Sequence, residues 1–308
     1  MNPSPPVILD PRAEGLFAAG ARLERLHTGA AWSEGPAWLA HAETLVWSDI
    51  PNNRMLAWSE REGGRVWRER AEFTNGHACA ADGALLHCSH GLRAIVRTRF
   101  DAQGRALPDE VLVDRYQGRR LNSPNDLVVK RDGTIWFTDP PYGILSDREG
   151  HRAPSELRAN YVFRFDPRDG SLDVVSDFPE EPNGLAFSPG EDILYVTDTS
   201  AALRSDGGGH HHIVAFDVVS GRTLARPRVF AVVEPGLADG LRVDERGWIY
   251  TSSEDSVQVY HPDGTRLARI PVPEKVGNLA FGGAARDQLY ICASTSLYRI
   301  PLNTRGNS

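Results

Sequence analysis

Two stretches of this sequence decide its fold: NDLVVKRDGTIWFTD at residues 125–139 and NGLAFSPGEDILYVTD at residues 183–198. Each begins with a polar pair, runs into a short apolar strand, and turns at glycine or proline. Each then returns in a second strand rich in β-branched and aromatic residues that ends in Thr-Asp. This pattern is typical of a β-hairpin. Because the two stretches match in order, they indicate an internal repeat.

The same phrase occurs six times along the chain. The copies begin 41, 50, 58, 56 and 38 residues apart, close to the ~40–50 residues of a propeller repeat. A third apolar run ending in a turn, such as Phe165–Gly170, and a fourth run after it complete the central copies. Four antiparallel strands per copy form the blade of a β-propeller. The copies begin at Glu34-Gly35, Asn75-Gly76, Asn125-Asp126, Asn183-Gly184, Asp239-Gly240 and Gly277-Asn278.

The predicted fold is therefore all-β, a six-bladed β-propeller with four-stranded antiparallel blades. The last copy supplies only about three strands, whereas a spare strand-like run, Arg22–His27, precedes the first copy. We expect this N-terminal strand to close the last blade, since an open sheet edge would invite aggregation. The expected organisation is an N-terminal arm (1–20), a single propeller domain (21–302) and a C-terminal tail (303–308).

Composition sets the broad class of the protein. The 308 residues include 34 Lys and Arg against 41 Asp and Glu, a net charge of −7, and 41% are hydrophobic. Scattered basic residues in an acidic chain argue against nucleic acid or a membrane surface as partner. No apolar run approaches the ~20 residues of a membrane span, and Met1–Leu16 does not resemble a secretory leader, so we expect a cytoplasmic protein. Cys79, Cys88 and Cys292 lack zinc-site spacing and are expected to be buried thiols.

The first strand of every blade lines the central channel of a propeller, so the six copy starts should converge. That ring would hold Glu34, Asn75, Asn125, Asn183, Asp239 and the Gly277-Asn278 step. Two carboxylates with amide carbonyls favour one divalent cation, most simply Ca²⁺, although Mg²⁺, Mn²⁺ or a catalytic Zn²⁺ stay open. Each Asn-Gly or Asp-Gly pair alone could be a turn. Glutamate is no turn former, so Glu34 carries the most weight.

The second strands end in Ser48-Asp49, Ser89-His90, Thr138-Asp139 and Thr197-Asp198. We expect these residues to bond the blade turns to one another, with His90 as a possible pocket residue because histidine titrates near neutrality. The tract His210–His212 after three glycines is expected to be a loop, with weak metal capture as the alternative. The chain lacks GxSxG, HExxH, Walker and GxGxxG motifs, which disfavours serine hydrolases, zincins, NTPases and dinucleotide enzymes.

Five motifs in order resemble the senescence-marker-protein (regucalcin) and gluconolactonase family, especially its bacterial gluconolactonase-like members. The resemblance covers about Trp32 to Leu302. The motifs are Ser33–Trp38, Asn122–Leu127, Phe137–Gly143, Pro182–Pro189 and Asp239–Leu241.

The resemblance implies a divalent metal in the channel mouth and the hydrolysis of sugar lactones such as glucono-1,5-lactone. Glu34, Asn183 and Asp239 match the family's metal ligands. Asn125 matches a residue that contacts substrate and approaches the metal, and Asp126 matches a substrate-site aspartate. Ser123 stands where animal members carry arginine, so the sugar contacts are expected to differ.

A metal could polarise the lactone carbonyl and activate water, and a carboxylate could take the water's proton. Asp239 is the predicted catalytic base, with Asp198 as second choice. Asn122, Asn75, His90 and Tyr142 complete the predicted substrate site, and the insert 144–160 is a candidate lid. Two alternatives stay open: hydrolysis of another ester or lactone on the same metal, and a non-catalytic calcium-binding propeller.

Overall fold

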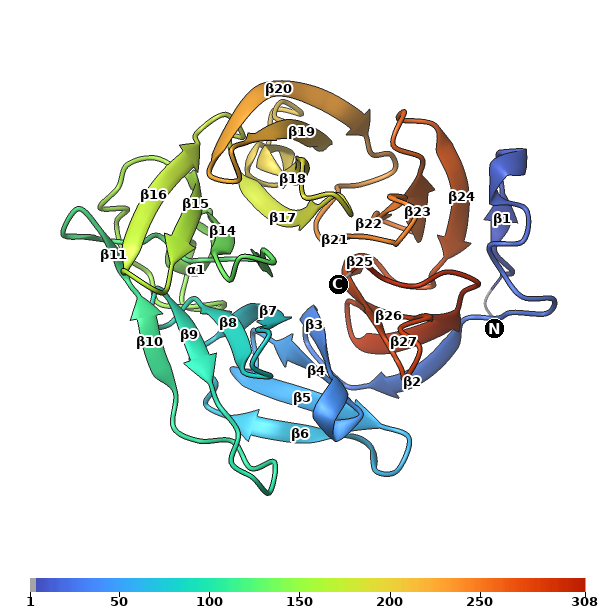
Figure 1. Cartoon of the computed structure of the whole chain (residues 1–308), viewed down its shortest axis with the longest axis horizontal. Helices are drawn as coiled ribbons and strands as arrows, with labels where there is room; N and C mark the ends of the chain where they lie inside the picture. Colours follow the sequence, from blue (N-terminus) through green and yellow to red (C-terminus); the bar gives the residue numbers. More distant parts are fainter. Residues whose placement is uncertain (1–3, 308) are drawn as a thin grey trace.

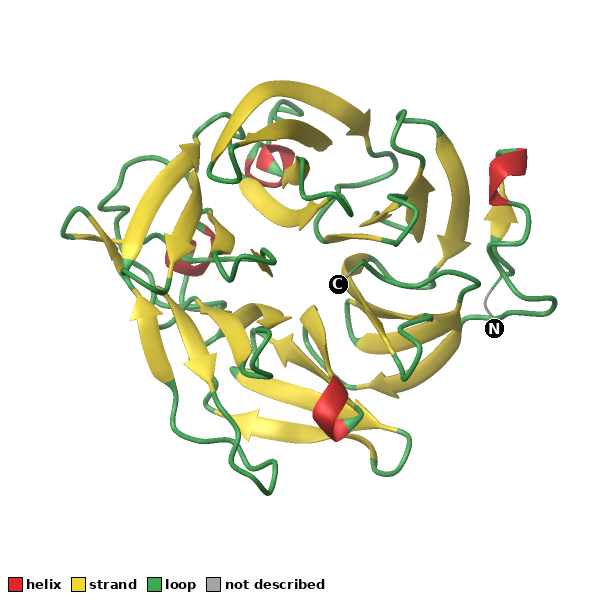
Figure 2. Ribbon diagram, viewed as in Figure 1, coloured by secondary structure: helices red, strands yellow, loops and turns green. Residues whose placement is uncertain are grey.

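The computed structural model describes residues 4–307, and its strands form a ring of blades around a central channel (Figure 1). Six four-stranded antiparallel blades make up the ring, which confirms the predicted propeller. Strands dominate and the few helices are short (Figure 2). From the channel outward the blades are β3 (Ser33–Leu39), β4 (Thr44–Asp49), β5 (Arg54–Ser59) and β6 (Gly63–Glu69); β7 (Thr74–Cys79), β8 (Leu85–Ser89), β9 (Ala94–Thr98) and β10 (Glu110–Val113); β13 (Leu127–Val129), β14 (Ile135–Asp139), β15 (Tyr161–Asp166) and β16 (Ser171–Ser176); β17 (Pro182–Phe187), β18 (Ile193–Asp198), β19 (His212–Val219) and β20 (Thr223–Val232); β21 (Leu241–Val243), β22 (Ile249–Ser252), β23 (Ser256–Tyr260) and β24 (Arg266–Pro271); and β25 (Val276–Gly282), β26 (Gln288–Ala293), β27 (Ser296–Pro301) and β2 (Glu24–Thr28).

The ring closes where the N-terminal strand joins the last blade. Strand β2 pairs antiparallel with β27, from Glu24 opposite Arg299 to Thr28 opposite Ser296. The predicted strand Arg22–His27 therefore forms at nearly the expected residues and in the expected place. Chain ends far apart in sequence are held in one sheet, so no blade is left incomplete.

The blades pack through large side chains of their second strands. Trp47, Trp136, Tyr250 and Tyr290 are almost fully buried and hold corresponding places in four blades. Trp136 meets Phe187 of the next blade edge-on, with ring centroids 5.4 Å apart. Such pairs add about 0.5–1.5 kcal/mol beyond their buried area.

Hydroxyl groups at the ends of the second strands bond each blade to the next. Thr138 Oγ1 donates to Asn183 O at 2.6 Å, and Thr197 Oγ1 donates to Asp239 O at 2.8 Å. The acidic residue that follows accepts backbone N–H groups from the loop entering its own blade: Asp139 accepts Asn122 N and Ser123 N, both at 2.8 Å. The prediction that these residues bond blade turns to one another is confirmed for these blades.

Glycine follows the ring residue because the inner strands approach closely. Gly184 N donates to Asp239 O at 3.0 Å, and a Cβ at Gly184 would lie 2.4 Å from that oxygen. Gly76 makes the equivalent bond to Asn125 O. A side chain at either position would push adjacent blades apart, so the Asn-Gly pairs are packing features as well as turn formers.

Residues 4–20 and 303–307 pack on the propeller instead of extending from it. Strand β1 (Val7–Ile8) adds to the outer edge of β24, followed by the 3-10 helix η1 (Pro11–Ala13). Leu16 is fully buried, and its carbonyl accepts Asn303 N. Asn307 N bonds to Val243 O, which brings the C-terminus toward the channel (Figure 1). Residues 1–3 and 308 of the predicted arm and tail lie outside the described residues.

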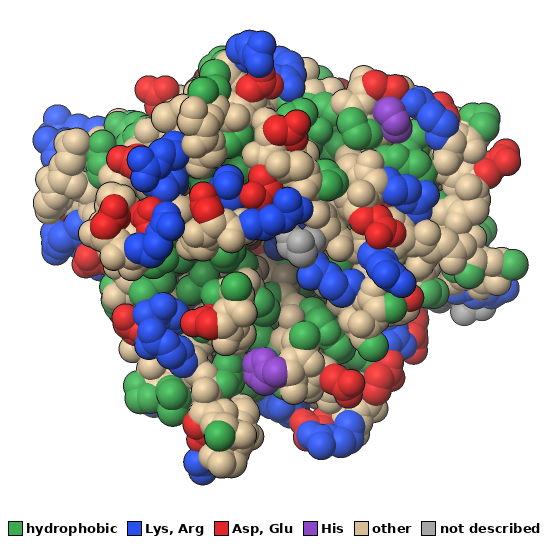
Figure 3. Space-filling view, in the orientation of Figure 1, with side chains coloured by type: hydrophobic (Ala, Val, Ile, Leu, Met, Phe, Trp, Pro, Cys, Tyr) green, Lys and Arg blue, Asp and Glu red, His purple; other side chains and the backbone are tan. Residues whose placement is uncertain are grey.

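Short elements fill the connections between strands. They are the 3-10 helices η2 (Ala40–Ala42) and η3 (Ser200–Leu203), the helix α1 (Tyr142–Leu145), and the hairpin β11 (Arg115–Tyr116) with β12 (Arg119–Arg120). Within residues 4–307, no helix has the length and apolar character needed to cross a bilayer. Acidic and basic side chains are interspersed on the face shown in Figure 3.

One prediction about the cysteines is wrong. Cys88 and Cys292 are buried, but Cys79 is exposed. Cys79 is the last residue of β7, where the inner strand ends and the channel widens, so solvent reaches its thiol.

Candidate functional site

The predicted ring forms at the entry ends of the inner strands. Glu34, Asn75 and Asn183 are each the second residue of β3, β7 and β17, whereas Asn125 and Asp239 stand two residues before β13 and β21. Pairing of β3, β7 and β17 with their second strands shifts register beside these residues. Such bulges re-aim side chains and are common next to active sites. The structure thus points polar side chains from five blades toward one end of the channel.

Glu34 is the most unusual group in the ring. Its side chain is buried, Oε2 accepts Gly35 N at 2.8 Å, and Oε1 has no hydrogen-bond partner among the described residues. Burial, and then the charges of Asp239 and Asp126, hold the pKa of Glu34 well above its usual range. A buried carboxylate oxygen without a donor is costly. A cation beside Oε1 would remove that cost.

Asp239 faces the same space and is half-buried. Burial raises the pKa of Asp239 to about 7; the Lys275 charge and the hydrogen bond from Asn183 oppose this, whereas the charges of Asp126 and Glu149 reinforce it. Its backbone N–H donates to Ser252 Oγ at 2.7 Å, which fixes the residue ahead of β21. Two carboxylates, on Glu34 and Asp239, therefore raise each other's proton affinity across the channel mouth.

Hydrogen bonds orient the amide side chains of the ring. Asn183 Nδ2 donates to Thr199 Oγ1 at 3.2 Å, and that hydroxyl also bonds the Tyr142 hydroxyl at 2.6 Å. Asn75 Nδ2 lies 3.4 Å from His90 Nε2. With their nitrogens bonded outward, both amides have their carbonyl oxygens available to the ring, as a hard cation requires.

His90 supports the ring in a different way from the predicted one. Its Nδ1 donates to Glu149 O at 2.8 Å, which leaves Nε2 as the acceptor for Asn75. Burial lowers the pKa of His90 to about 4, so the imidazole is neutral at physiological pH. The expectation that it titrates near neutrality is wrong, because a side chain with about 1% exposure gains no hydration when protonated.

The structure places Asp126 and Asn122 in bonded positions. Asp126 accepts Leu127 N at 2.9 Å and, at 3.3 Å each, Asn278 Nδ2 and Arg242 Nη1, so it lies one step further into the channel. Asn122 is fully buried. Its amide nitrogen donates to Asp139 O and Ala159 O, and its oxygen accepts Ser155 Oγ. These bonds favour a role for Asn122 in holding the loops and leave its side chain without a free polar atom for substrate.

Two charged residues near the ring were missed. Glu149 belongs to the insert 144–160, which lies over His90 through the Glu149 carbonyl, and Lys275 precedes β25. Both affect the pKa of Asp239, in opposite directions. Neither belongs to the repeated phrase, so only the number of residues in the insert could have drawn attention to Glu149.

Metal-type clusters are otherwise absent from the part of the chain that the structure describes. No group of three or more His, Cys, Asp or Glu residues there could hold a metal ion. The ring escapes that definition because amides supply half of its donors. His210 and His212 stack with ring centroids 4.5 Å apart, and His211 Nδ1 donates to Val233 O. The histidine tract therefore forms no such cluster.

A family model described as the SMP-30/Gluconolactonase/LRE-like region matches residues 32–295. The chain belongs to this SMP-30/gluconolactonase family. The resemblance inferred from five motifs is thus confirmed, and the match ends near the predicted limits of Trp32 and Leu302.

Characterised members of the SMP-30/gluconolactonase family are similar over most of the chain. A gluconolactonase of Zymomonas mobilis is 31% identical over 96% of this chain and 85% of its own length. The pentonolactonase XacC of Haloferax volcanii is 30% identical over 84% of this chain and 80% of its own length. The solved structure of a gluconolactonase from Xanthomonas campestris has a TM-score of 0.87 and 43% identity, and the match covers 97% of this chain and 95% of that one.

Proposed function

We propose that this protein is a metal-dependent lactonase that opens sugar lactones, with glucono-1,5-lactone as its substrate type. The observation that carries the proposal is the partnerless buried Oε1 of Glu34, which faces a ring that also contains Asp239 and Asn183. Relatives named gluconolactonase and pentonolactonase support the substrate class.

The residues present fit a hard divalent cation. Glu34, Asn183 and Asp239 would hold it through one oxygen each, with Asn125 close by. This all-oxygen donor set favours Ca²⁺ over Zn²⁺, and it suits Mg²⁺ and Mn²⁺ as well. When bound, the ion would supply Lewis-acid polarisation of the lactone carbonyl and a water of lowered pKa.

The chain's own groups would carry the proton and position the ring. Asp239 is the proposed base: a carboxylate oxygen accepts a proton from the attacking water while the water oxygen bonds to the carbonyl carbon. The ring C–O bond then breaks, and the proton passes to the departing ring oxygen to give the hydroxy acid. The bonded chain of Tyr142, Thr199 and Asn183, and the pair His90 and Asn75, would keep both amides aimed at the site.

The test is the initial rate of glucono-1,5-lactone opening, followed as acid release above the spontaneous rate. Chelator-stripped protein should be inactive and should regain activity with one of Ca²⁺, Mg²⁺, Mn²⁺ or Zn²⁺ added singly. Glu34→Gln should lose the restored rate, whereas Glu14→Gln, on an exposed residue of the arm, should keep it. A full rate without metal would refute the metal dependence. Metal binding measured by calorimetry, without turnover of this or a five-carbon sugar lactone, would refute the lactonase proposal.

A further inference from the structure

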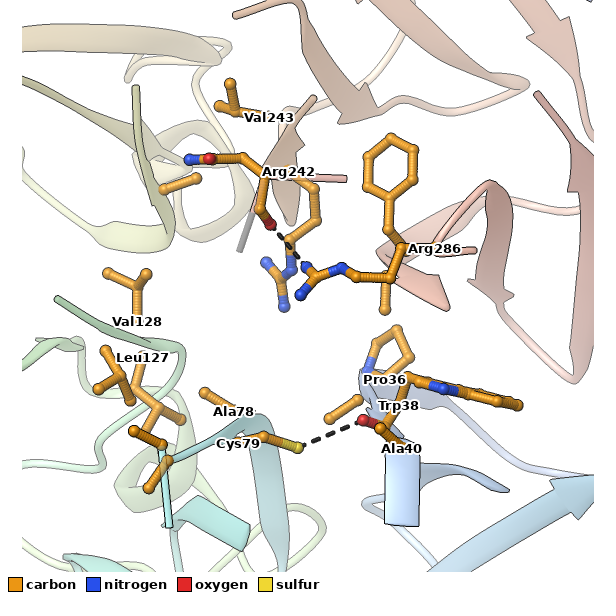
Figure 4. Close-up of a pocket in the computed structure, with 18 of the residues that line it drawn as sticks. Pro36, Trp38, Ala40, Ala78, Cys79, Leu127, Val128, Arg242, Val243 and Arg286 are labelled. Atoms are coloured by element: carbon orange, nitrogen blue, oxygen red, sulfur yellow. Dashed lines mark hydrogen bonds between the residues drawn. The ribbon is translucent and has the colours of Figure 1, made fainter. Parts of the chain in front are cut away.

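The channel opens again at the end opposite the ring. A cavity of about 660 Å³ lies there, between the exit ends of the inner strands and the turns that follow them (Figure 4). Its walls are largely apolar and come from several blades. They include Ala78, Leu127, Leu185, Phe187, Val243 and Phe281. Volumes of about 300–1,000 Å³ with apolar walls are typical of small-molecule sites.

Two arginines reach into this apolar space. Figure 4 shows the guanidinium groups of Arg242 and Arg286 extending between the walls from neighbouring blades. Arg242 Nη1 donates to Leu241 O at 2.7 Å and, at 3.3 Å, to Asp126. Arg286 Nη2 donates to Asn307 O at 2.7 Å, and no carboxylate among residues 4–307 forms an ion pair with it. Each guanidinium thus keeps N–H groups directed at the cavity.

The other ionisable groups of the lining do not neutralise this charge. Glu191 pairs with Lys130 at 3.2 Å and accepts Arg131 N, so it is committed elsewhere. Cys79 donates its thiol to Trp38 O, and burial raises the pKa of that thiol to about 11, so it adds no negative charge at neutral pH. The remaining groups are His41, which stacks on Phe100, and the exposed Glu43 of the turn after η2.

We infer that this end of the channel is a second binding site, for an organic anion with an apolar body and a carboxylate or phosphate head group. Guanidinium forks match the planar oxygens of both head groups. The apolar walls would bury the rest of the ligand. A polyhydroxylated sugar acid does not suit them, because its hydroxyl groups would lose water without gaining partners. The inference is therefore independent of the proposed lactonase site at the other end.

Calorimetry or ligand-observed NMR on the whole chain tests this site, with hexanoate and hexyl phosphate as probes and hexanol and gluconate as comparators. At least one anionic probe should bind with a Kd below about 1 mM, and neither comparator should bind at that level. Arg286→Gln should weaken binding by at least about tenfold, since one partner of a charge-assisted contact is lost. Arg61→Gln, on a side chain that is 86% exposed, should leave binding unchanged.

Arg286 lies at the channel rim, so its substitution should leave the fold intact, and the thermal midpoint of the variant verifies this. Arg286→Lys keeps the charge but loses the fork, and intermediate binding would support recognition by geometry. Absence of binding by both anions, equal binding of hexanol, or unchanged affinity in Arg286→Gln would each overturn the inference. The preferred head group, carboxylate or phosphate, follows from the two probes.

Discussion

Glu34→Gln should stabilise the metal-free protein and abolish its stabilisation by metal. Without a cation, the wild-type side chain keeps Oε1 buried and unpartnered beside the negative charges of Asp239 and Asp126. Glutamine has nearly the same shape, keeps an oxygen for Gly35 N, and brings a neutral amide that can donate. Leaving a buried polar group unsatisfied costs about 1–3 kcal/mol. At about 2 °C per kcal/mol for a chain of this size, the metal-free variant should melt about 2–6 °C higher than wild type.

Saturating metal should reverse that order. A ligand at 100 times its Kd stabilises the folded state by about 2.7 kcal/mol, which would raise the wild-type midpoint by about 5 °C. The variant should gain little, because one ligand oxygen has been replaced by a donor. Scanning calorimetry at pH 8, with chelator and then with the metal that restores activity, measures both shifts, and Glu14→Gln should behave as wild type. A variant that melts below wild type in chelator, or that gains as much from metal, would refute the assignment of Glu34.

Three further outcomes are expected. Because the pKa of Asp239 is raised to about 7, protons compete with a cation there; metal affinity should rise as pH increases toward 7, by up to about tenfold per pH unit, and calorimetric titrations at pH 5.5, 6.5 and 7.5 measure this. Thr138→Val removes the buried hydroxyl bond to Asn183 O and should cost about 1–3 kcal/mol in chemical denaturation, whereas Thr223→Val on an outer strand should cost almost nothing; equal losses would contradict the role of the inter-blade bonds. A chain lacking residues 1–28 should expose the edge of β27 and elute from size exclusion as aggregate, and a monodisperse product would contradict closure by β2.

The repeat made much of the site predictable. Hairpin turns and strand alternation are local features, and when they recur six times the ring of first strands follows, which places Glu34, Asn183 and Asp239 at one end of the channel. The predictions about individual side chains fared less evenly. The thiol of Cys79 is exposed and the imidazole of His90 is not a neutral-pH titrating group. Burial at those positions depends on the channel width and on the insert, neither of which is part of the repeat.

By itself, the sequence determined the six blades, the closing strand and the convergence of two carboxylates with several amides, because each follows from a pattern that neighbouring residues set. Only the tertiary structure decided which atoms lack partners and which are already bonded. It left Oε1 of Glu34 alone, engaged every polar atom of the Asn122 side chain, and aimed Arg242 and Arg286 into one apolar cavity. Hydrogen bonding and burial arise from contacts between residues distant in the chain, and these exist only once the ring has closed.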